Sequence, residues 1–471
     1  MEYDCLLIGH NEMDFSIYEE NVRKMGQESE AYQNLLFDCI KVDGRLKSVC
    51  EVLNSGICKD DNITLGETFS ATIAYLVSFA YRKGIKIDYI RDFQRQKEDI
   101  IKRLCVNKYH SIGISTTLYV SFMPIIEIID FIRKYDKSIK IILGGPFVFN
   151  VVKQYDKFTL EYLLLQIGAD VFINSMQGEQ ALVNSIINIK KGKSLRYVDN
   201  IIYIENRKIY FNNMYPENNQ LCENMVDWSL FSHDIGKYVA LRTSISCPFN
   251  CKFCTFPKHA GKYQAVNVNA IAYELDSLSK INKIERIHFI DDTFNIPPER
   301  FQQLLKMMIE RKYNFKWHSY ARCQFLDEET VKLMKESGVE GVFLGIESGS
   351  QTILNNMNKR VKVEDYKRGI QLLKKYNIIT FASYIIGFPG ETEKTVDETI
   401  DFIKSVKTDF WRAQLWYGEV LSDVYQEKEK YNIIGSQYSW KHNTMDSKQA
   451  NKILIKMFKD IRTCLHKKNM V

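Results

Sequence analysis

The residues of this sequence that point most clearly to chemistry are three cysteines in one short segment, Cys247-Pro-Phe-Asn-Cys251-Lys-Phe-Cys254. Thiolates are ligands for soft metals and iron–sulfur clusters, and one loop after a buried strand would present all three together. A four-iron cluster held by only three thiolates keeps one iron open for a small-molecule ligand. A zinc site is the alternative, and it needs a fourth ligand such as Cys222 or His259. The compact spacing favours the cluster.

Three further motifs bring acids, hydroxyls and glycines to the ends of predicted strands. They are Ile290-Asp291-Asp292-Thr293-Phe294, Gly345-Ile346-Glu347-Ser348-Gly349-Ser350 and Gly387-Phe388-Pro389-Gly390-Glu391-Thr392. Each motif also has a structural interpretation. Asp291 can cap a helix, Glu347 can cap a turn, and the glycines can serve tight turns.

These motifs can act together only if the fold places them at the same edge of a sheet. Strands alternate with helical patterns from residue 238 to 420, and they are predicted at 239–244, 286–290, 316–321, 341–345, 379–386 and 410–416. Six such units suit a partial (β/α)6 TIM barrel, in which the carboxyl ends of the strands carry the functional residues. Residues 421–471 are predicted to form a C-terminal helical segment.

On these motifs the sequence resembles the radical SAM superfamily. The resemblance implies that the three cysteines bind a [4Fe-4S] cluster whose open iron takes the amine and carboxylate of S-adenosyl-L-methionine (SAM). It places Phe253 beside the adenine, Glu347 and Ser348 near the ribose or amine, and Arg322 near the carboxylate. Two acids replace the glycine-rich second-strand motif of other members. The implied SAM-binding residues are Phe253, Asp291, Asp292, Arg322, Glu347, Ser348 and Gly387.

Residues 1–199 have a second alternating pattern, with strands predicted at 4–9, 85–90, 110–115, 140–143 and 170–174. Strands separated by helices predict a parallel, doubly wound (Rossmann-like) α/β sheet, which binds ligands outside the carboxyl ends of its strands. A polar helical insertion is predicted at about 14–63. Residues 200–237 are predicted to be a connector, a hairpin at 200–211 followed by a loop.

This N-terminal pattern, upstream of a radical SAM barrel, resembles the cobalamin-binding domain of class B radical SAM enzymes. Small and hydroxylated residues at the strand ends would admit the nucleotide tail of cobalamin. The sequence departs from the D-x-H-x-x-G motif of other cobalamin proteins. His10 falls two residues early, and it is either a lower axial cobalt ligand or a hydrogen-bonding residue. The implied cobalamin-binding residues are His10, Asn11, Ser115, Thr116, Thr117, Gly144, Gly145, Pro146, Gly178 and Glu179.

Two aromatic-rich motifs near the C-terminus, 413–417 and 435–446, are similar to the subgroup that contains a phosphinate P-methyltransferase. The resemblance implies an apolar substrate cavity. Core packing is the alternative for each aromatic residue, and a structural hydrogen bond is the alternative for the histidine. The residues predicted to line the cavity are Trp411, Trp416, Tyr417, Trp440 and His442.

The composition limits the class of protein. The 471 residues are 45% hydrophobic and 26% charged, with a net charge of +6 that is not clustered. This balance predicts a soluble globular protein with no nucleic-acid face. No run of ~18 apolar residues predicts a transmembrane helix, and the N-terminus does not resemble a signal peptide. The 11 cysteines do not form a small disulfide framework, so we expect a reducing cytoplasm.

The resemblance implies a cobalamin-dependent radical SAM methyltransferase that uses a [4Fe-4S] cluster, SAM and cobalamin. The methyl group would pass from SAM through methylcobalamin to an unactivated carbon, or a phosphinate phosphorus, of a natural-product intermediate. The substrate is a small molecule or peptide, and the electron donor a protein such as flavodoxin or ferredoxin. A cobalamin-binding enzyme that catalyses a rearrangement, ring contraction or cyclisation stays open, as does a zinc-held nucleic-acid-binding protein.

Overall fold

The computed structural model describes residues 1–11, 15–24, 26, 32, 39–42, 45–48, 68–117, 119 and 121–461. The chain forms two compact units, Met1–Asp14 with Leu65–Val239 and Phe15–Thr64 with Ala240–Val471. Most of the predicted insertion at about 14–63 lies outside the described residues. Its described part is not purely helical, because helix α1 (Phe15–Lys24) is followed by an antiparallel hairpin of β2 (Cys39–Val42) and β3 (Arg45–Ser48).

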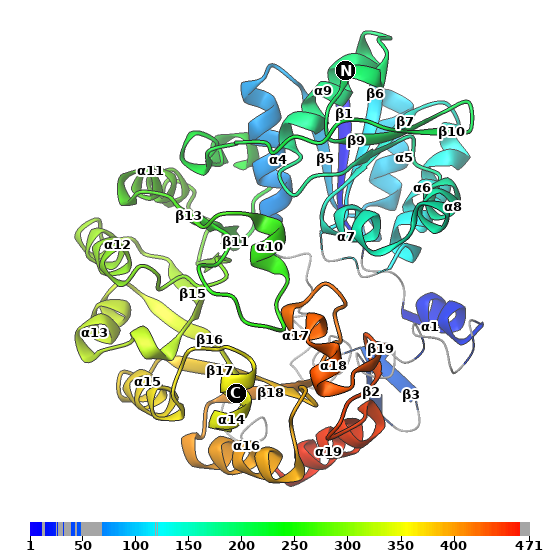
Figure 1. Ribbon diagram of the computed structural model, residues 1–471. Coiled ribbons are helices and arrows are strands. Elements are labelled where there is room, and N and C mark those ends of the chain that lie inside the picture. The colour runs from blue at the N-terminus through cyan, green and yellow to red at the C-terminus, as the bar shows by residue number, and fades with distance from the viewer. Residues whose placement is uncertain are drawn as a thin grey trace. The chain divides into compact units, whose positions relative to one another are not determined.

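The sheet of the first unit has the strand order β10-β9-β8-β7-β6-β1-β5 (Figure 1). Its strands β5, β1, β6, β7 and β8 run parallel, so the parallel strands follow the order 2-1-3-4-5 along the chain. The strand bounds are β1 (Glu2–His10), β5 (Ile87–Asp92), β6 (Lys108–Ser115), β7 (Lys140–Gly144), β8 (Val171–Ile173), β9 (Ile201–Glu205) and β10 (Lys208–Phe211).

The predicted hairpin at 200–211 is confirmed, but it does not connect two sheets. Its first strand, β9, pairs antiparallel with β8, and β10 pairs antiparallel with β9. The side chains of Ile201, Ile202 and Tyr203 are buried, so the hairpin extends the first sheet at one edge.

Both faces of the first sheet are covered. Side chains of β1 alternate, with Leu6 and Ile8 packed in one core and Cys5 in the other. Helices α5 to α8 contribute to the first core, and α4 and α9 to the second. This confirms the predicted doubly wound fold. The helices are α4 (Ala71–Arg82), α5 (Lys97–Val106), α6 (Met123–Tyr135), α7 (Pro146–Gln154), α8 (Lys157–Ile167) and α9 (Glu179–Lys190).

The sheet of the second unit has the order β18-β17-β16-β15-β14-β11, and the two-residue β4 (Thr68–Phe69) pairs with the first residues of β11. The pairs from β14 to β18 are parallel. All six strands expected of the partial barrel are present. They are β11 (Tyr238–Leu241), β14 (Arg286–Phe289), β15 (Lys316–Ala321), β16 (Val339–Glu347), β17 (Ile379–Ile386) and β18 (Phe410–Leu415).

Helices follow these strands in turn and lie along one side of the sheet (Figure 1). Their buried residues recur at helical spacing, as Phe301, Leu304, Leu305 and Met308 do in α12. The helices are α11 (Val268–Ser279), α12 (Pro298–Glu310), α13 (Glu328–Glu336), α14 (Gln351–Asn356), α15 (Val363–Lys375) and α16 (Glu393–Val406).

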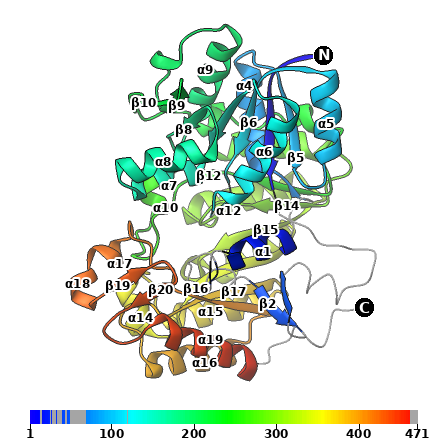
Figure 2. The ribbon, with the colours of Figure 1, turned by 90° about the vertical axis from the view of Figure 1, so that its right-hand side faces the viewer.

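The predicted C-terminal helical segment is only partly helical. A hairpin of β19 (Ile434–Ser436) and β20 (Ser439–Lys441) lies beside α17 (Asp423–Gln426) and α18 (Lys428–Tyr431), and α19 (Ser447–Asp460) follows it (Figures 1 and 2). Tyr425 of α17 donates its hydroxyl to the Gly435 carbonyl at 2.7 Å. Across the described part of the chain, no helix is long and apolar enough to span a membrane.

Candidate functional site

The three predicted cluster cysteines lie on one loop of the second unit. The antiparallel pair β12 (Ser244–Ile245) and β13 (Gln264–Ala265) closes the loop at its base, and the short helix α10 (Phe256–Ala260) lies within it. Cys251 is buried, Cys247 and Cys254 are partly buried, and all three are free thiols. Burial raises the pKa of the Cys254 thiol to about 11. A metal that binds here would therefore displace the thiol proton.

Lys252, between the second and third cysteines, is held on three sides. Its N–H donates to the Met357 carbonyl at 2.9 Å, and its carbonyl accepts from the Val424 N–H at 3.0 Å. Its ammonium pairs with the carboxylate of Glu427. The backbone between two of the predicted ligands is thus fixed by residues far away in the sequence.

Lys258 of α10, which follows the third cysteine, also contacts the C-terminal segment. Its ammonium pairs with Asp423 of α17 and donates to the Leu421 carbonyl at 3.3 Å. The cysteine loop is therefore fastened to the C-terminal segment at two separate lysines.

The donor set of this loop suits an iron–sulfur cluster. Three thiolates can each bind a different iron of a four-iron cluster, which leaves the fourth iron open. A zinc site would need a fourth ligand besides these cysteines, such as Cys222 or His259. The cluster and the zinc alternative both stay predictions.

The adjacent acids Asp291 and Asp292, which follow β14, have different surroundings. Asp291 is buried, and its carboxylate accepts from the Thr243 N–H at 2.9 Å, the Thr243 hydroxyl at 3.0 Å and the Ser244 hydroxyl at 2.6 Å. Burial raises the pKa of Asp291, and these donors oppose that rise. Asp292 is exposed. Asp291 therefore fastens the connection between β11 and β12. Desolvation, together with the neighbouring Asp291, raises the pKa of the Asp292 carboxyl to about 6.

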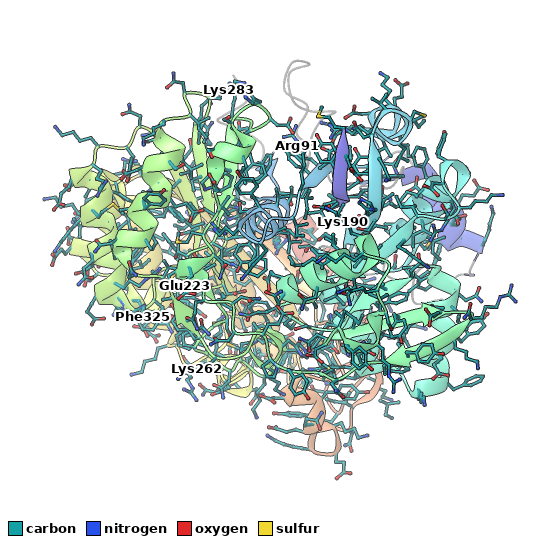
Figure 3. All side chains as sticks on the ribbon, turned by 90° about the horizontal axis from the view of Figure 1, so that it is seen from above. Arg91, Lys190, Glu223, Lys262, Lys283 and Phe325 are labelled. Carbon is teal, nitrogen blue, oxygen red and sulfur yellow. The ribbon has the colours of Figure 1, made fainter. Side chains whose placement is uncertain are left out.

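Arg322 follows β15 and lies beside the cysteine loop. It is 8% exposed, with Nη2 3.7 Å from the Cys251 sulfur and 2.9 Å from the Lys359 carbonyl, to which it donates. Its guanidinium carbon lies 3.6 Å from the ring centre of Phe249, which packs against Phe325 (labelled in Figure 3). The Nη1 atom is buried and has no hydrogen-bond partner. Because an unpaired buried N–H is costly, this side chain fits an anionic ligand.

Glu347 and Ser348, at the end of β16, have different neighbours. Glu347 has a left-handed backbone, with φ 65°, and its Oε1 accepts from the Lys359 ammonium at 2.8 Å. The Ser348 hydroxyl is fully buried and lies 3.1 Å from the Thr399 hydroxyl of α16. Ser348 therefore joins this strand end to α16, whereas Glu347 is turned toward Lys359.

Gly387 lies in a turn after β17 that only glycine fits. Its φ is 88°, and an added Cβ would lie 2.4 Å from the Trp440 ring. Its N–H donates to Glu391 Oε2 at 2.5 Å, and its carbonyl accepts from His442 Nε2 at 3.1 Å. Burial raises the pKa of Glu391 to about 8. These contacts explain Gly387 without any ligand.

Three residues predicted to line a substrate cavity are packed together. Trp416 and Trp440 are buried with ring centres 5.2 Å apart, and the His442 ring stacks on Trp440 at 5.1 Å. The Trp440 Nε1–H donates to the Trp416 carbonyl at 2.9 Å. Burial lowers the pKa of His442. These are the packing and hydrogen-bonding roles that the sequence left as alternatives, and a role in a cavity stays a prediction.

The other two predicted cavity residues make pairs of their own. The Trp411 ring stacks on Phe458 of α19, with centres 5.2 Å apart. The exposed Tyr417 lies edge to face with Tyr438, with centres 5.1 Å apart. These two residues therefore have aromatic partners outside the group of Trp416, Trp440 and His442.

The predicted cobalamin residues follow the parallel strands of the first sheet. His10 and Asn11 follow β1, residues 115–117 end β6, residues 144–146 end β7, and Gly178 and Glu179 follow β8. Strand order reverses between β1 and β6, and ligands of doubly wound sheets bind at this switch point, outside the carboxyl ends. The sheet therefore brings the predicted residues to the edge where a ligand is expected.

Hydroxyl groups gather at the end of β6. The Ser115 and Thr117 hydroxyls are 3.1 Å apart, and the Thr72 hydroxyl of α4 donates to Thr117 at 3.3 Å. The Thr116 hydroxyl donates to the Gly144 carbonyl at 3.0 Å. Gly145 has φ 120°, and an added Cβ would lie 2.7 Å from the Thr116 hydroxyl. Thr72 is a member of this cluster that no sequence motif indicated.

Asn11 and His10, after β1, already have neighbours within the first unit. The Asn11 side chain donates to the Pro124 carbonyl at 2.9 Å and to Glu127 at 3.0 Å, and it accepts from Gln94 at 2.8 Å. The His10 ring stacks near Tyr119, with centres 6.2 Å apart. Asn11 therefore supports the loop rather than offering unused polar atoms.

Glu179 and Gly178 open helix α9. Glu179 accepts from the Asn219 side chain at 2.7 Å. The carboxylate of Glu217 accepts the N–H groups of Gln180 and Ala181 at 2.8 and 2.9 Å. A carboxylate from the segment after β10 thus already satisfies this helix N-terminus.

Sequence reasoning also missed residues beside the cysteine loop. The Thr293 hydroxyl lies 3.6 Å from the Cys247 sulfur, and its place in the motif at 290–294 was the available signal. Lys359 contacts Glu347 and Arg322, but it lies in the polar stretch Asn358-Lys359-Arg360, which reads as a solvated surface.

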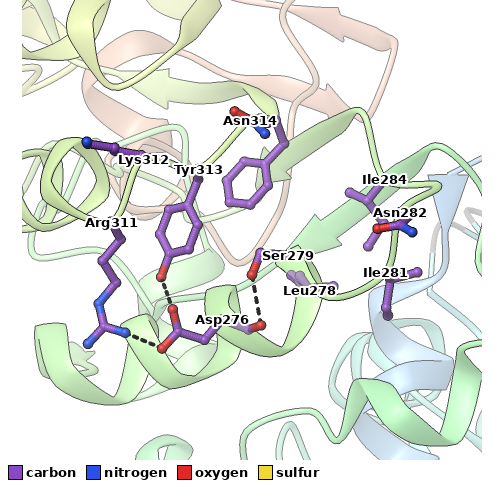
Figure 4. Close-up of a pocket in the computed structure, with 11 residues that line it drawn as sticks. Asp276, Leu278, Ser279, Ile281, Asn282, Ile284, Arg311, Lys312, Tyr313 and Asn314 are labelled. Carbon is purple, nitrogen blue, oxygen red and sulfur yellow. Dashed lines mark hydrogen bonds and ion pairs between the residues drawn. The ribbon is translucent and has the colours of Figure 1, made fainter.

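A cavity of about 490 Å³ lies away from all these residues (Figure 4). It is lined by the ends of α11 and α12 and by the loops that precede β14 and β15. Asp276 there accepts from the Tyr313 hydroxyl at 2.6 Å and pairs with Arg311. The cavity is at the amino ends of these strands, whereas Asp291 and Arg322 follow their carboxyl ends.

Comparison with known proteins identifies the second unit. Residues 241–403 match the Radical SAM superfamily. These residues of the chain form a radical SAM domain. The match begins at the last residue of β11 and ends within α16, so it contains the cysteine loop, Arg322, Glu347 and Gly387.

The curated relatives that this chain matches are named for different reactions. An uncharacterized methyltransferase of Pyrococcus horikoshii is 27% identical over 348 residues, which are 69% of this chain and 73% of that protein. An anaerobic magnesium-protoporphyrin IX monomethyl ester cyclase of Rubrivivax gelatinosus is 25% identical over 55% of this chain, which spans half the length of that cyclase.

Solved structures show the same two-part fold. The methyltransferase TsrM of Kitasatospora setae, solved with cobalamin and a [4Fe-4S] cluster, has a TM-score of 0.64 at 16% identity over 91% of this chain and 78% of its own. The cobalamin-dependent enzyme OxsB, solved with aqua-cobalamin and SAM, has a TM-score of 0.60 at 17% identity over 90% of this chain and 55% of its own. The fold of this chain is thus shared with TsrM and OxsB.

Proposed function

We propose that this protein is a cobalamin-dependent radical SAM methyltransferase. It transfers a methyl group from SAM to an unactivated carbon, or a phosphinate phosphorus, of a natural-product intermediate. The observation that carries the proposal is the presence of two candidate ligand sites in one chain. The second unit has a loop of three cysteines, and beside it lies the buried Nη1 of Arg322, which has no hydrogen-bond partner. The first unit has a cluster of hydroxyl groups at the switch point of its sheet.

The cysteine loop and its neighbours form the proposed SAM site. Cys247, Cys251 and Cys254 hold the [4Fe-4S] cluster, Arg322 binds the SAM carboxylate, and Glu347 binds the SAM amine. Phe253 lies in the loop between Lys252 and Cys254, where a ring can pack on the adenine. Arg322 suits its role because its Nη1 is buried without a partner, and charge-assisted bonds to carboxylates are strong.

The first unit is the proposed cobalamin site, with Ser115, Thr117 and Thr72 at the ligand edge. When bound, the cluster supplies the electron that cleaves one SAM molecule, and cobalamin carries the methyl group of a second SAM. The chain binds, orients and shields these groups, as proteins do around cofactors that carry difficult chemistry. A radical SAM enzyme needs a reductant, and we propose flavodoxin or ferredoxin.

Cyclisation is a second candidate function, because one relative is named a cyclase. In that reaction SAM is cleaved in the same way, but no methyl group reaches the product. The two candidates share every residue of the proposed SAM site, so the product must distinguish them.

SAM with a deuterated methyl group tests the proposal. The reconstituted protein is incubated with this SAM, a chemical reductant and a small-molecule extract of the source cells. Methyl transfer predicts three products: S-adenosylhomocysteine, 5′-deoxyadenosine and a molecule that carries the labelled methyl group. A new product that forms with 5′-deoxyadenosine but carries no label would contradict methyl transfer and support cyclisation.

A further inference from the structure

Lys359 forms a buried ion pair that the chain is built to accommodate. Its ammonium lies 2.8 Å from Glu347 Oε1, and the two side chains are 8% and 11% exposed. An added Cβ at Gly345 would lie 2.6 Å from that oxygen and 3.3 Å from the ammonium, so a glycine leaves the room for the pair. Glu347 also keeps the left-handed φ of 65°, which costs energy for a side chain of this kind.

The main chain of the same lysine holds Arg322. The Lys359 carbonyl accepts from Arg322 Nη2 at 2.9 Å, and the same Nη2 lies 3.7 Å from the Cys251 sulfur. The other terminal nitrogen, Nη1, is buried and unpartnered. Lys359 thus contacts Arg322 through its carbonyl and Glu347 through its ammonium, and among the described residues Arg322 and Glu347 form no ion pair with each other.

Lys359 also reaches the cysteine loop. Its ammonium lies 5.6 Å from the ring centre of Phe253, at the outer limit of a cation–π contact. Its backbone N–H donates to the Leu354 carbonyl at 3.0 Å, which fixes the segment after α14. One residue therefore contacts all three side chains that the proposed SAM site uses for adenine, amine and carboxylate.

We infer that Lys359 is a positioning residue of the SAM site. By neutralising one carboxylate oxygen of Glu347 it prevents that acid from pairing with Arg322. The acid and the guanidinium thus stay separate, one for a cation and one for an anion. This arrangement is complementary to the ammonium and carboxylate of an α-amino acid, which is the methionyl end of SAM. The inference rests on the proposed function.

Replacement of the charge tests this role. Lys359→Gln can still donate a hydrogen bond to Glu347 but carries no charge, and Lys359→Arg keeps the charge. Lys332→Gln, on the exposed face of α13, is the matched control. SAM binding to the anaerobically reconstituted proteins is measured by equilibrium dialysis. The change in the electron paramagnetic resonance spectrum of the reduced cluster on SAM addition is the spectroscopic readout.

We expect K359Q to hold as much iron as the wild-type protein but to bind SAM about tenfold more weakly or worse, with a smaller spectral change. K359R should restore most of the affinity, and K332Q should match the wild type. Unchanged affinity in K359Q would overturn the inference. Equal losses in K359Q and K359R, or a loss of iron from K359Q, would overturn it too, because charge would then not be what matters. If the wild-type protein itself holds iron but binds no SAM, the proposed function fails instead.

Discussion

The ammonium of Lys252 pairs with the carboxylate of Glu427, 175 residues further along the chain. Lys252 lies between two of the predicted cluster ligands, and its carbonyl also accepts from Val424. The C-terminal segment, which the family match at 241–403 does not include, thus holds the cysteine loop in place.

We expect Glu427→Gln to loosen this loop. The side chains of Lys252 and Glu427 are 25% and 31% exposed, and a pair of this kind is worth up to about 1 kcal/mol, so a chelator should remove iron from the variant roughly fivefold faster. Visible absorbance during incubation with a chelator measures this rate. The double variant Lys252→Glu with Glu427→Lys should recover much of the lost protection. Iron loss at the wild-type rate in Glu427→Gln would show that the pair does not hold the loop.

A large side chain at the switch point should block cobalamin. Thr117 is partly exposed at the end of β6, so we expect Thr117→Trp to lower cobalamin affinity about tenfold or more by occupying the ligand edge. Lys108→Trp, at the amino end of the same strand, is the control and should bind normally. Gly145 is a poorer target, because its φ of 120° makes any substitution strained. Dialysis against hydroxocobalamin measures binding, and equal uptake by Thr117→Trp and wild type would refute this site.

The buried acid Glu391 should make stability depend on pH. Burial raises its pKa from 4.5 to about 8, so its contribution to stability is fully present below pH 4.5 and is lost as the pH rises through about 8. Glu391→Gln keeps an acceptor for the Gly387 N–H but cannot ionise. We compare the free energy of unfolding of the variant with that of the wild type at each pH. At ~1.4 kcal/mol per pKa unit, we expect the difference, variant minus wild type, to be a few kcal/mol larger at pH 9 than at pH 5.

Denaturant unfolding at the two pH values measures this difference. Glu393→Gln, an exposed acid in the first turn of α16, is the control and should show no such gain. A difference between Glu391→Gln and wild type that stays constant from pH 5 to pH 9 would mean that Glu391 is ionised in the fold throughout.

Much of the fold was predictable, because the spacing of apolar residues along the sequence agrees with the burial of those residues in the structure. In β1 the run Cys5-Leu6-Leu7-Ile8 is buried on both faces, as expected of a parallel strand, and α12 buries residues at helical spacing. The hairpin β9–β10 was predictable from its turn, but its pairing with β8 was not, since a local signal does not name a distant partner. The C-terminal hairpin was missed for the same reason, because its short strands are held by contacts such as Tyr425 to Gly435.

The residues of the candidate site that belong to a sequence motif were predictable. Those that reach the site only through tertiary contacts were not. The cysteine spacing and the strand-end motifs indicated Cys251 and Glu347, and the family resemblance implied Arg322. Lys359 has no such signal, because its burial arises only when the segment after α14 packs beside β15 and β16. The tight packing of Trp416, Trp440 and His442 was equally invisible, since a cavity wall and a core use the same aromatic residues.

One loop of three cysteines is proposed to hold a four-iron cluster. Iron and acid-labile sulfide are measured per chain after anaerobic reconstitution. We expect about four of each in the wild-type protein and almost none when Cys247, Cys251 and Cys254 are all changed to Ala. The control Cys222→Ala, an exposed cysteine outside the loop, should keep the wild-type content. Full iron and sulfide in the triple variant, or bound zinc that is lost in Cys222→Ala, would show that this loop does not hold a four-iron cluster.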